Sequence, residues 1–236
     1  MADMVKAAPY DWPYDGAIDP SKMALLIIDM QHDFCGKGGY VDLMGYDISQ
    51  TALTTAPIKA VLDMVRRIPG FTVIYSREGH RPDLADLPAN KRWRSQRIGA
   101  GIGDPGPCGC ILVRGEAGWD ITAELKPEAN ELIVDKPGKG SFYATDLEII
   151  LRTRQISHLV LTGITTDVCV HTTMREANDR GYECFLLADC TGATDEGNYH
   201  AALKMIQLQG GVFGAVSTAQ AFIEALHRLG SCQGAA

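Results

Sequence analysis

The chain alternates short apolar runs with amphipathic segments from residue 23 to residue 229. The apolar runs predict strands at 23–29, 71–76, 131–136, 158–164, 183–189 and 211–216. Continuous runs such as "MALLIID" at 23–29 are typical of strands that are buried on both faces of a sheet. Helices are predicted between them, at 58–68, 145–154, 168–181, 198–209 and 218–229.

Strands that alternate with helices favour parallel pairing through right-handed crossovers. We therefore predict an α/β fold, a doubly wound three-layer sandwich with a six-stranded parallel sheet. Ligands in such folds bind at the carboxyl ends of the strands. The side chains that follow the strand ends are therefore the first candidates for chemistry.

The pattern predicts one domain, at 23–229, between an N-terminal arm at 1–22 and a C-terminal tail at 230–236. The arm is rich in Pro, Tyr and Trp, a composition that suits either a segment lying over a neighbouring surface or a poorly ordered one. The region 78–127 is dense in Pro, Gly and charge, and is predicted as a long loop. Loops of this length are usually functional or form interfaces.

Composition narrows the class of protein. The 236 residues carry a formal net charge of -7, with a pI near 5.3, which argues against nucleic acid or an anionic membrane as partner. The arm lacks the apolar core of a signal peptide, so we expect a cytoplasmic protein. The seven cysteines are scattered and odd in number, and we expect them to be reduced thiols rather than a disulfide framework.

Three reactive side chains occupy the carboxyl ends of predicted strands: Asp29 and Lys136 end the strands 23–29 and 131–136, and Cys169 lies just beyond the strand 158–164. Each also has a structural interpretation, as a helix cap, a solvated lysine and a core thiol. Their common placement at one edge of the sheet favours a hydrolytic set. In that interpretation Lys136 holds Asp29 ionised, and Asp29 accepts the thiol proton and returns it to the leaving nitrogen.

The position of Cys169 predicts an activated thiol. A helix N-terminus lowers a thiol pKa through the helix dipole and the free N–H groups. The residues "TTD" at 165–167 are candidate capping residues just before Cys169,. The same N–H groups can stabilise a developing oxyanion.

The motifs "ALLIIDMQHDFC" (24–35), "VDKPGKGSF" (134–142) and "GITTDVCVHTT" (163–173) resemble those of the isochorismatase-like cysteine hydrolases. The resemblance extends from about residue 23 to residue 229. It implies a catalytic triad of Asp29, Lys136 and Cys169, and an oxyanion hole from the N–H groups of Thr165 and Cys169. It also implies a cis peptide between Ile164 and Thr165, and a homo-oligomer, a tetramer or a dimer.

Departures from parts of that family narrow the expected reaction. Isochorismatases proper lack this cysteine, so Cys169 favours C–N bond hydrolysis. Nicotinamidases carry a metal site of the form Asp-x-His after the second strand, where this chain has Glu78 and His80. The long loop holds no further histidine, so we expect no metal and no cofactor, and His80 is interpreted as a hydrogen-bonding residue that orders the loop.

Two further stretches, "REGHRPDL" and "GAGIGDPG", resemble the biuret hydrolase branch of the family. This resemblance predicts that the protein hydrolyses biuret to allophanate and ammonia. The reaction is expected to pass through a thioester-like intermediate. Phe34, Gln209 and Ile164 are the candidate substrate-binding residues, although Gln209 also suits a plain helix end. Ureidoacrylate and N-carbamoyl amino acids are alternative substrates, and nicotinamide is a weaker one. The basic cluster 91–97 is interpreted as a solvated loop or subunit contact, or as an attractor of anionic ureides. A non-catalytic thiol scaffold is the alternative from another class.

Overall fold

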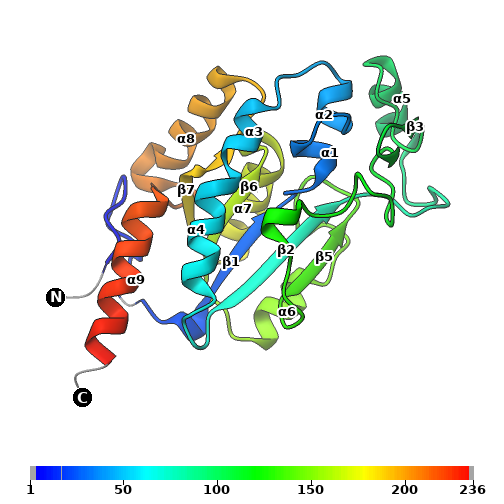
Figure 1. Cartoon of the computed structure of the whole chain (residues 1–236). Coiled ribbons are helices and arrows are strands. Elements are labelled where there is room, and N and C mark those ends of the chain that lie inside the picture. The colour runs from blue at the N-terminus through cyan, green and yellow to red at the C-terminus, as the bar shows by residue number, and fades with distance from the viewer. Residues whose placement is uncertain (1–3, 17, 234–236) are drawn as a thin grey trace.

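The structure is a computed structural model, and it describes residues 4–16 and 18–233. A six-stranded sheet runs through its middle (Figure 1), with the strand order β5-β2-β1-β6-β7-β8 and every pair parallel. The strands are β1 (Met23–Ile28), β2 (Thr72–Glu78), β5 (Leu132–Lys136), β6 (His158–Ile164), β7 (Glu183–Gly192) and β8 (Ala215–Ser217). The predicted α/β fold with its six parallel strands is confirmed.

Helices cover both faces of the sheet. They are α1 (His32–Cys35), α2 (Tyr40–Leu43), α3 (Ser49–Leu53), α4 (Thr55–Val65), α5 (Ala89–Arg97), α6 (Leu147–Thr153), α7 (His171–Asp179), α8 (Glu196–Gly211) and α9 (Ala219–Gln233). Short 3₁₀ turns lie at Pro20–Lys22 and Ala123–Leu125, and a two-stranded ribbon pairs β3 (Pro105–Gly106) with β4 (Gly109–Cys110).

Alternate side chains of β1 enter two separate cores. Leu25 and Ile27 pack in the core beneath α4 and α9, whereas Leu26 and Ile28 pack in the core that α6, α7 and α8 cover. This alternation follows from the pleat of a strand, whose successive side chains point to opposite faces. Burial on both faces explains why the strand reads as a continuous apolar run. No helix in the described ranges is long and apolar enough to cross a membrane.

The N-terminal arm packs on its own chain. Ala8 exchanges backbone hydrogen bonds with Val216 at the β8 edge, and Val5 does so with Trp12. The Trp12 side chain is fully buried and stacks on Phe185 of β7, with 4.6 Å between the ring centroids. Of the two alternatives for the arm, the described part thus takes the one in which it covers a surface.

Two segments differ from their predictions. The basic cluster 91–97 is not a loop: it forms most of α5, which projects beside the sheet in Figure 1. The last strand begins at Ala215 rather than 211, because α8 continues to Gly211 through a kink in which Gln209 and Gly210 adopt positive φ. The last helix reaches Gln233, so it takes in part of the predicted tail, and residues 234–236 lie outside the described residues.

Candidate active site

Four side chains meet where β1, β2, β5 and β6 end. Glu78 and Lys136 are the last residues of β2 and β5, and they are paired in register. Asp29 directly follows β1, and its N–H donates to the carbonyl of Ser76 in β2 over 2.9 Å. Cys169 lies in a π-helical turn, Thr166–Val170, that follows β6. The site lies where the chain changes direction across the sheet, between β1 and β6, which is where ligands bind in doubly wound folds,.

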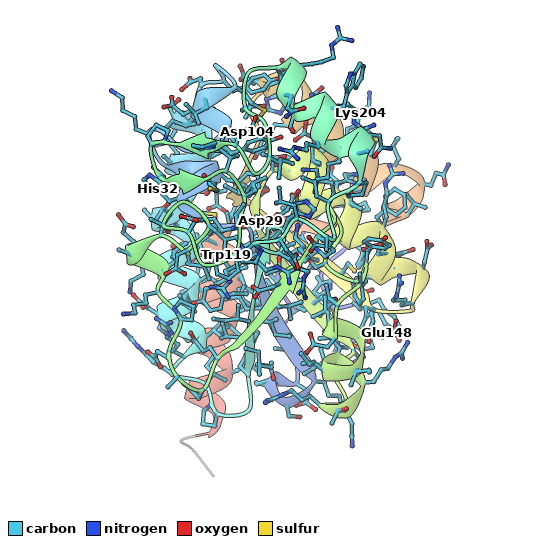
Figure 2. The ribbon with its side chains drawn as sticks, turned by 90° about the vertical axis from the view of Figure 1, so that its right-hand side faces the viewer. Asp29, His32, Asp104, Trp119, Glu148 and Lys204 are labelled. Carbon is cyan, nitrogen blue, oxygen red and sulfur yellow. The ribbon has the colours of Figure 1, made fainter. Side chains whose placement is uncertain are left out.

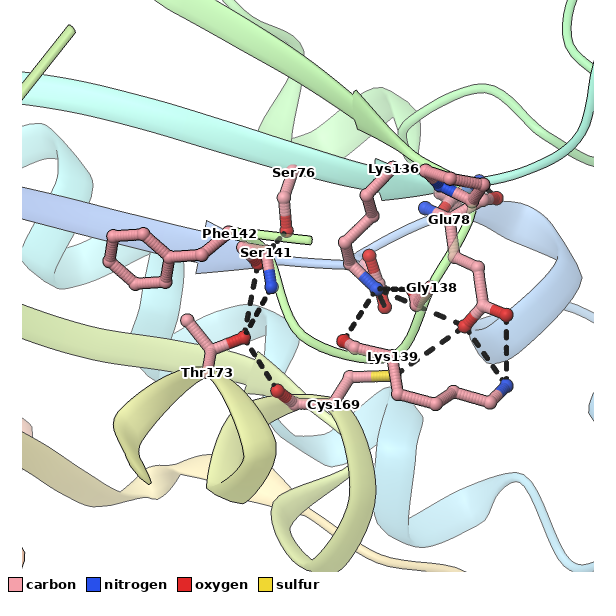
Figure 3. A network of polar contacts seen from close by, with 12 residues as sticks. Ser76, Glu78, Lys136, Gly138, Lys139, Ser141, Phe142, Cys169 and Thr173 are labelled. Atoms are coloured by element: carbon pink, nitrogen blue, oxygen red, sulfur yellow. Dashed lines mark hydrogen bonds and ion pairs between the residues drawn. The ribbon is translucent and has the colours of Figure 1, made fainter. Parts of the chain in front are cut away.

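Asp29 and Lys136 form a fully buried ion pair, with 2.7 Å between Oδ2 and Nζ. Figure 2 shows Asp29 near the middle of the molecule, whereas Glu148 lies at its edge. Lys136 also donates to the carbonyls of Gly138 and Lys139, over 3.0 and 2.9 Å (Figure 3). A lysine with three oxygen partners in a buried site has little freedom, so it fixes the position of the Asp29 carboxylate.

The pKa of Asp29 and the pKa of Lys136 both lie above their ordinary values. Burial raises the pKa of Asp29, the ammonium of Lys136 opposes this, and the charge of Glu78 adds to it. Burial alone would lower the pKa of Lys136, but attraction to Asp29 and its other anionic neighbours outweighs burial and raises it. Lys136 therefore stays charged, and Asp29 is a stronger base than an exposed aspartate.

Asp29 also has a distinctive backbone. Its φ is +51°, in the left-handed region that residues other than glycine rarely occupy, and such conformations cost about 1–3 kcal/mol. The structure retains it through the ion pair to Lys136 and the backbone bond to Ser76.

Cys169 is buried at the wall of the site, and its thiol donates to Oε2 of Glu78, with 3.5 Å between Sγ and the oxygen. Burial raises the pKa of Cys169 well above its ordinary value, and the positive charge of Lys136 only partly opposes this. The prediction of a thiol acidified by a helix start is therefore wrong. A helix dipole contributes about 0.3–1 kcal/mol, less than the cost of charging a group out of contact with water.

The local helix geometry also differs from the prediction. Cys169 lies in the π-helical turn rather than in the first turn of an α-helix, and no side-chain capping bond is made at Thr165. Thr166 bonds instead to Thr191 of β7, with 2.9 Å between the hydroxyl oxygens. The peptide between Ile164 and Thr165 is cis, as the family resemblance implies.

Glu78 is the site residue that sequence reasoning missed as a contributor to chemistry. Its carboxylate is fully buried, with Lys91 Nζ at 2.8 Å and Lys139 Nζ at 2.9 and 3.0 Å from its oxygens. Lys136 Nζ lies 3.9 Å away. Burial would raise the pKa of Glu78, but these three ammonium groups outweigh burial and lower it. Because β2 extends to Glu78 rather than ending at the predicted residue 76, the rule that selected Asp29, a polar residue at the end of a buried strand, also applies to Glu78.

His80 makes the kind of hydrogen-bonding contact to the following loop that was predicted for it. The ring is buried, and Nδ1 lies 3.2 Å from Asp86 Oδ1. The ligand atoms of Asp29, Glu78 and Cys169 all lie within 4.8 Å of one another, a spacing that suits a metal ion. However, the two carboxylates already bind ammonium groups, and a cation would have to displace them. The donor set fits lysine better than metal, and we derive no step through a metal.

A cavity of about 520 Å³ opens at Cys169. Its lining comprises Phe34, Tyr40, Val41, Met44, Tyr46, Lys139, Thr165, Asp167, Val168, Cys169, Thr194, Asp195 and Asn198. Phe34 is therefore part of the wall, where the sequence placed it, and Thr165 faces the same space as Cys169. This volume suits a small ligand with a few polar groups.

Gln209 and Ile164 do not line this cavity. Gln209 is exposed at the C-terminal end of α8. Since α8 begins at the carboxyl edge of the sheet and runs back to the amino edge before β8, its last turn lies away from Cys169. Gln209 therefore does not reach the cavity formed by its own chain, and its position suits the alternative interpretation, a helix end. The Ile164 side chain is fully buried in the core beneath α4 and α9, so it does not face the cavity.

The family model for the isochorismatase domain matches residues 23–221. The chain belongs to the isochorismatase family. It is 35% identical to the ureidoacrylate amidohydrolase RutB of Serratia proteamaculans over 89% of this chain and 85% of that protein, and 35% identical to the protein of the same name from Caulobacter segnis over 93% and 90%. These names match the alternative substrate that the sequence left open rather than biuret.

Solved structures of the family share the fold. A cysteine hydrolase from Pseudomonas syringae pv. phaseolicola superposes with a TM-score of 0.77 at 26% identity, over 95% of this chain and 97% of that one. An N-carbamoylsarcosine amidase from Thermoplasma acidophilum does so with a TM-score of 0.63 at 24% identity, over 84% and 96%. The second likeness establishes the family fold alone.

Proposed function

We propose that this protein is a cysteine amidohydrolase that cleaves a urea-type C–N bond. The observation that carries the proposal is the placement of the Cys169 thiol at the wall of the cavity, with the buried pair of Asp29 and Lys136 behind it. A nucleophile, a base and a group that fixes the base are the parts that covalent hydrolysis of an amide requires.

In the proposed reaction, Sγ of Cys169 attacks the carbamoyl carbon while Asp29 takes the thiol proton. The N–H groups of Thr165 and Cys169 stabilise the negative oxygen of the tetrahedral intermediate. The C–N bond then breaks, and Asp29 returns its proton to the leaving nitrogen. Water attacks the resulting thioester-like intermediate, Asp29 takes a proton from the water, and the C–S bond breaks as the thiol regains its proton. Lys136 keeps Asp29 in place throughout.

Ureidoacrylate is the first candidate substrate. The two relatives described above carry the name ureidoacrylate amidohydrolase and align with this chain over most of its length. Ureidoacrylate presents the terminal carbamoyl group that the proposed mechanism needs, together with a carboxylate.

Biuret is the second candidate, and the charge of the cavity favours it. Asp167 and Asp195 lie among the lining residues, and the lining cation, Lys139, is already bound to Glu78. An anionic substrate would meet two carboxylates there, whereas the neutral biuret molecule would not. The motifs that resemble the biuret hydrolase branch support the same candidate.

Ammonia release tests the proposal. We expect turnover of ureidoacrylate or biuret, weaker turnover of N-carbamoylsarcosine and none of nicotinamide. The Cys169→Ala variant should lose turnover at least ~10⁴-fold while its circular dichroism spectrum is unchanged. Turnover retained in that variant would contradict the mechanism, and activity on nicotinamide alone would contradict the substrate class. Inactivity on all four compounds would favour the thiol scaffold.

A further inference from the structure

The Glu78 carboxylate contacts the Cys169 thiol and the ammonium groups of Lys91 and Lys139, and the Lys136 ammonium lies 3.9 Å away. Oε2 accepts the thiol hydrogen bond, and the Lys139 ammonium binds both carboxylate oxygens (Figure 3). Lys91 reaches the same carboxylate from α5, while Lys136 reaches it from the end of β5. An ion-pair cluster that only stabilises the fold does not require a thiol as a partner. The hydrogen bond from Cys169 to Glu78 therefore suggests that Glu78 takes part in the reaction.

Two carboxylates therefore face one thiol, and their surroundings differ. Within the described residues, Asp29 makes one ion pair, with Lys136, and burial raises the pKa of Asp29. Glu78 has three ammonium neighbours that outweigh burial and lower its pKa. Two carboxylates in unlike surroundings commonly divide the work, one carrying the proton and the other remaining charged.

We propose that Glu78 is a further catalytic residue, which stays ionised and accepts the hydrogen bond of the Cys169 thiol in the resting site. The S–H then turns to Asp29, which takes the proton as the sulfur attacks. The part of Glu78 in turnover rests on the proposed function, but its contact with the thiol does not. When the proton passes from Cys169 to Asp29, two anions still face three ammonium groups, because thiolate and Glu78 replace Asp29 and Glu78. The transfer therefore creates no new net charge in a buried site.

Two other titratable groups lie near Glu78, and neither competes for this role. Burial raises the pKa of Tyr40 in α2, and burial lowers the pKa of His80 after β2. Both side chains are therefore neutral at neutral pH. The charged groups facing Glu78 and the thiol remain Asp29, Lys91, Lys136 and Lys139.

The pH dependence of Cys169 alkylation by iodoacetamide tests the proposal without any substrate. Glu78→Gln keeps the shape of the side chain and removes its charge. Because a negative charge beside a thiol disfavours the thiolate, the midpoint of alkylation, followed at Cys169 by peptide mass spectrometry, should move to lower pH by about one unit. Ammonia release should fall ~10²-fold in kcat, with KM changed only a few-fold, because the Cys169 thiol loses the charged acceptor that orients it for attack.

Glu131→Gln is the matched control. Glu131 is also a buried carboxylate, bound by Arg66 over 2.8 Å at the other edge of the sheet. This variant should leave the alkylation midpoint and kcat unchanged, even where its melting temperature falls.

Lys139→Met provides a second test that does not depend on the folding of Glu78→Gln. Removal of a positive charge should move the alkylation midpoint to higher pH, opposite to Glu78→Gln. A midpoint that stays in place or rises in Glu78→Gln, or that falls in Lys139→Met, would overturn the proposal. If both midpoints move as expected but no ureide is turned over, the role of Glu78 at the thiol stands and the proposed function fails.

Discussion

At the scale of single residues, burial has more effect than residue type on the pKa values of the site. The carboxyl of Asp29 and the thiol of Cys169 are both out of contact with water, and burial raises the pKa of each. The free enzyme is therefore expected to hold a protonated thiol beside an aspartate of increased basicity. In the proposed reaction, proton transfer from Cys169 to Asp29 therefore accompanies the attack, and general-base catalysis takes the place of a preformed thiolate.

The acid limb of the pH profile of kcat/KM reports the raised pKa of Asp29. Because the pKa of Asp29 is raised above its ordinary 3.8, its basic form is lost at higher pH than in an exposed aspartate as pH falls. We expect the acid limb of kcat/KM to have its midpoint above pH 3.8. Asp29→Asn should lower kcat/KM at least ~10²-fold at all pH values. A limb at or below pH 3.8, in protein shown to be folded there by circular dichroism, would contradict this prediction.

Sequence could predict Asp29, Lys136 and Cys169 because each lies at or just beyond the carboxyl end of a strand, and the carboxyl ends of parallel strands meet at one edge,. It could not predict the contacts of Lys91 and Lys139. Their positions relative to Glu78 depend on how α5 and the loop after β5 fold back over the sheet edge. The raised pKa of Cys169 was missed because burial depends on tertiary packing, whereas a helix start is visible in the sequence.

At the scale of secondary-structure elements, helix α5 connects the long region 78–127 to the site. Its sequence, "ANKRWRSQR", has no apolar face, and Ser95 is its buried residue. Hydrophobic periodicity therefore gave no signal for this helix. Yet α5 delivers Lys91 to Glu78 and to the carbonyl of Pro137, over 2.8 Å in each case. One residue of the basic cluster, Lys91, thus contacts the buried Glu78, while the arginines of the cluster remain at the surface.

Replacement of that lysine should uncouple α5 from the site. In Lys91→Met, a buried carboxylate loses one charged donor, so we expect the free energy of unfolding to fall by about 1.5–3 kcal/mol. The midpoint of Cys169 alkylation should also rise, because one positive charge leaves the cluster. Arg94→Met on the exposed face of the same helix is the control, and it should change both quantities little. Urea denaturation and alkylation rates measure the two effects, and equal effects of both variants would contradict this role of α5.

The kink in α8 is a second feature that the hydrophobic pattern did not predict. The sequence ends the helix at "LQGG" and begins a strand at 211, since glycines commonly follow helices. The structure instead carries the chain through Leu208, Gln209 and Gly210 in non-helical conformations before β8. The apolar residues of "GVFGAV" are therefore divided between the turn and the strand, which a run of hydrophobic letters does not reveal.

The two edges of the sheet have different roles at the scale of the whole molecule. The reactive groups gather at the carboxyl edge, whereas the N-terminal arm is fastened at the start of β6 and along β8. There the Trp12 ring lies 5.6 Å from the ring of His158, the first residue of β6, and it also stacks on Phe185. A doubly wound fold allows the site and the arm to lie apart, because its reactive residues lie in the loops at the carboxyl edge of the sheet. The rest of the surface can then carry contacts that stabilise the fold.

Loss of the Trp12 ring should therefore cost stability without altering the chemistry. The side chain is fully buried, and Trp→Ala changes in such sites cost about 3–5 kcal/mol because a cavity remains,. We expect Trp12→Ala to lower the free energy of unfolding by this amount in urea, while kcat and the Cys169 alkylation midpoint stay at wild-type values under conditions where the variant is folded. Tyr14→Ala, in the same arm but 73% exposed, should change stability by less than about 0.5 kcal/mol,. A shift of the alkylation midpoint in folded Trp12→Ala would show that the two edges are coupled, and the arm would then have to be counted among the elements that position the site.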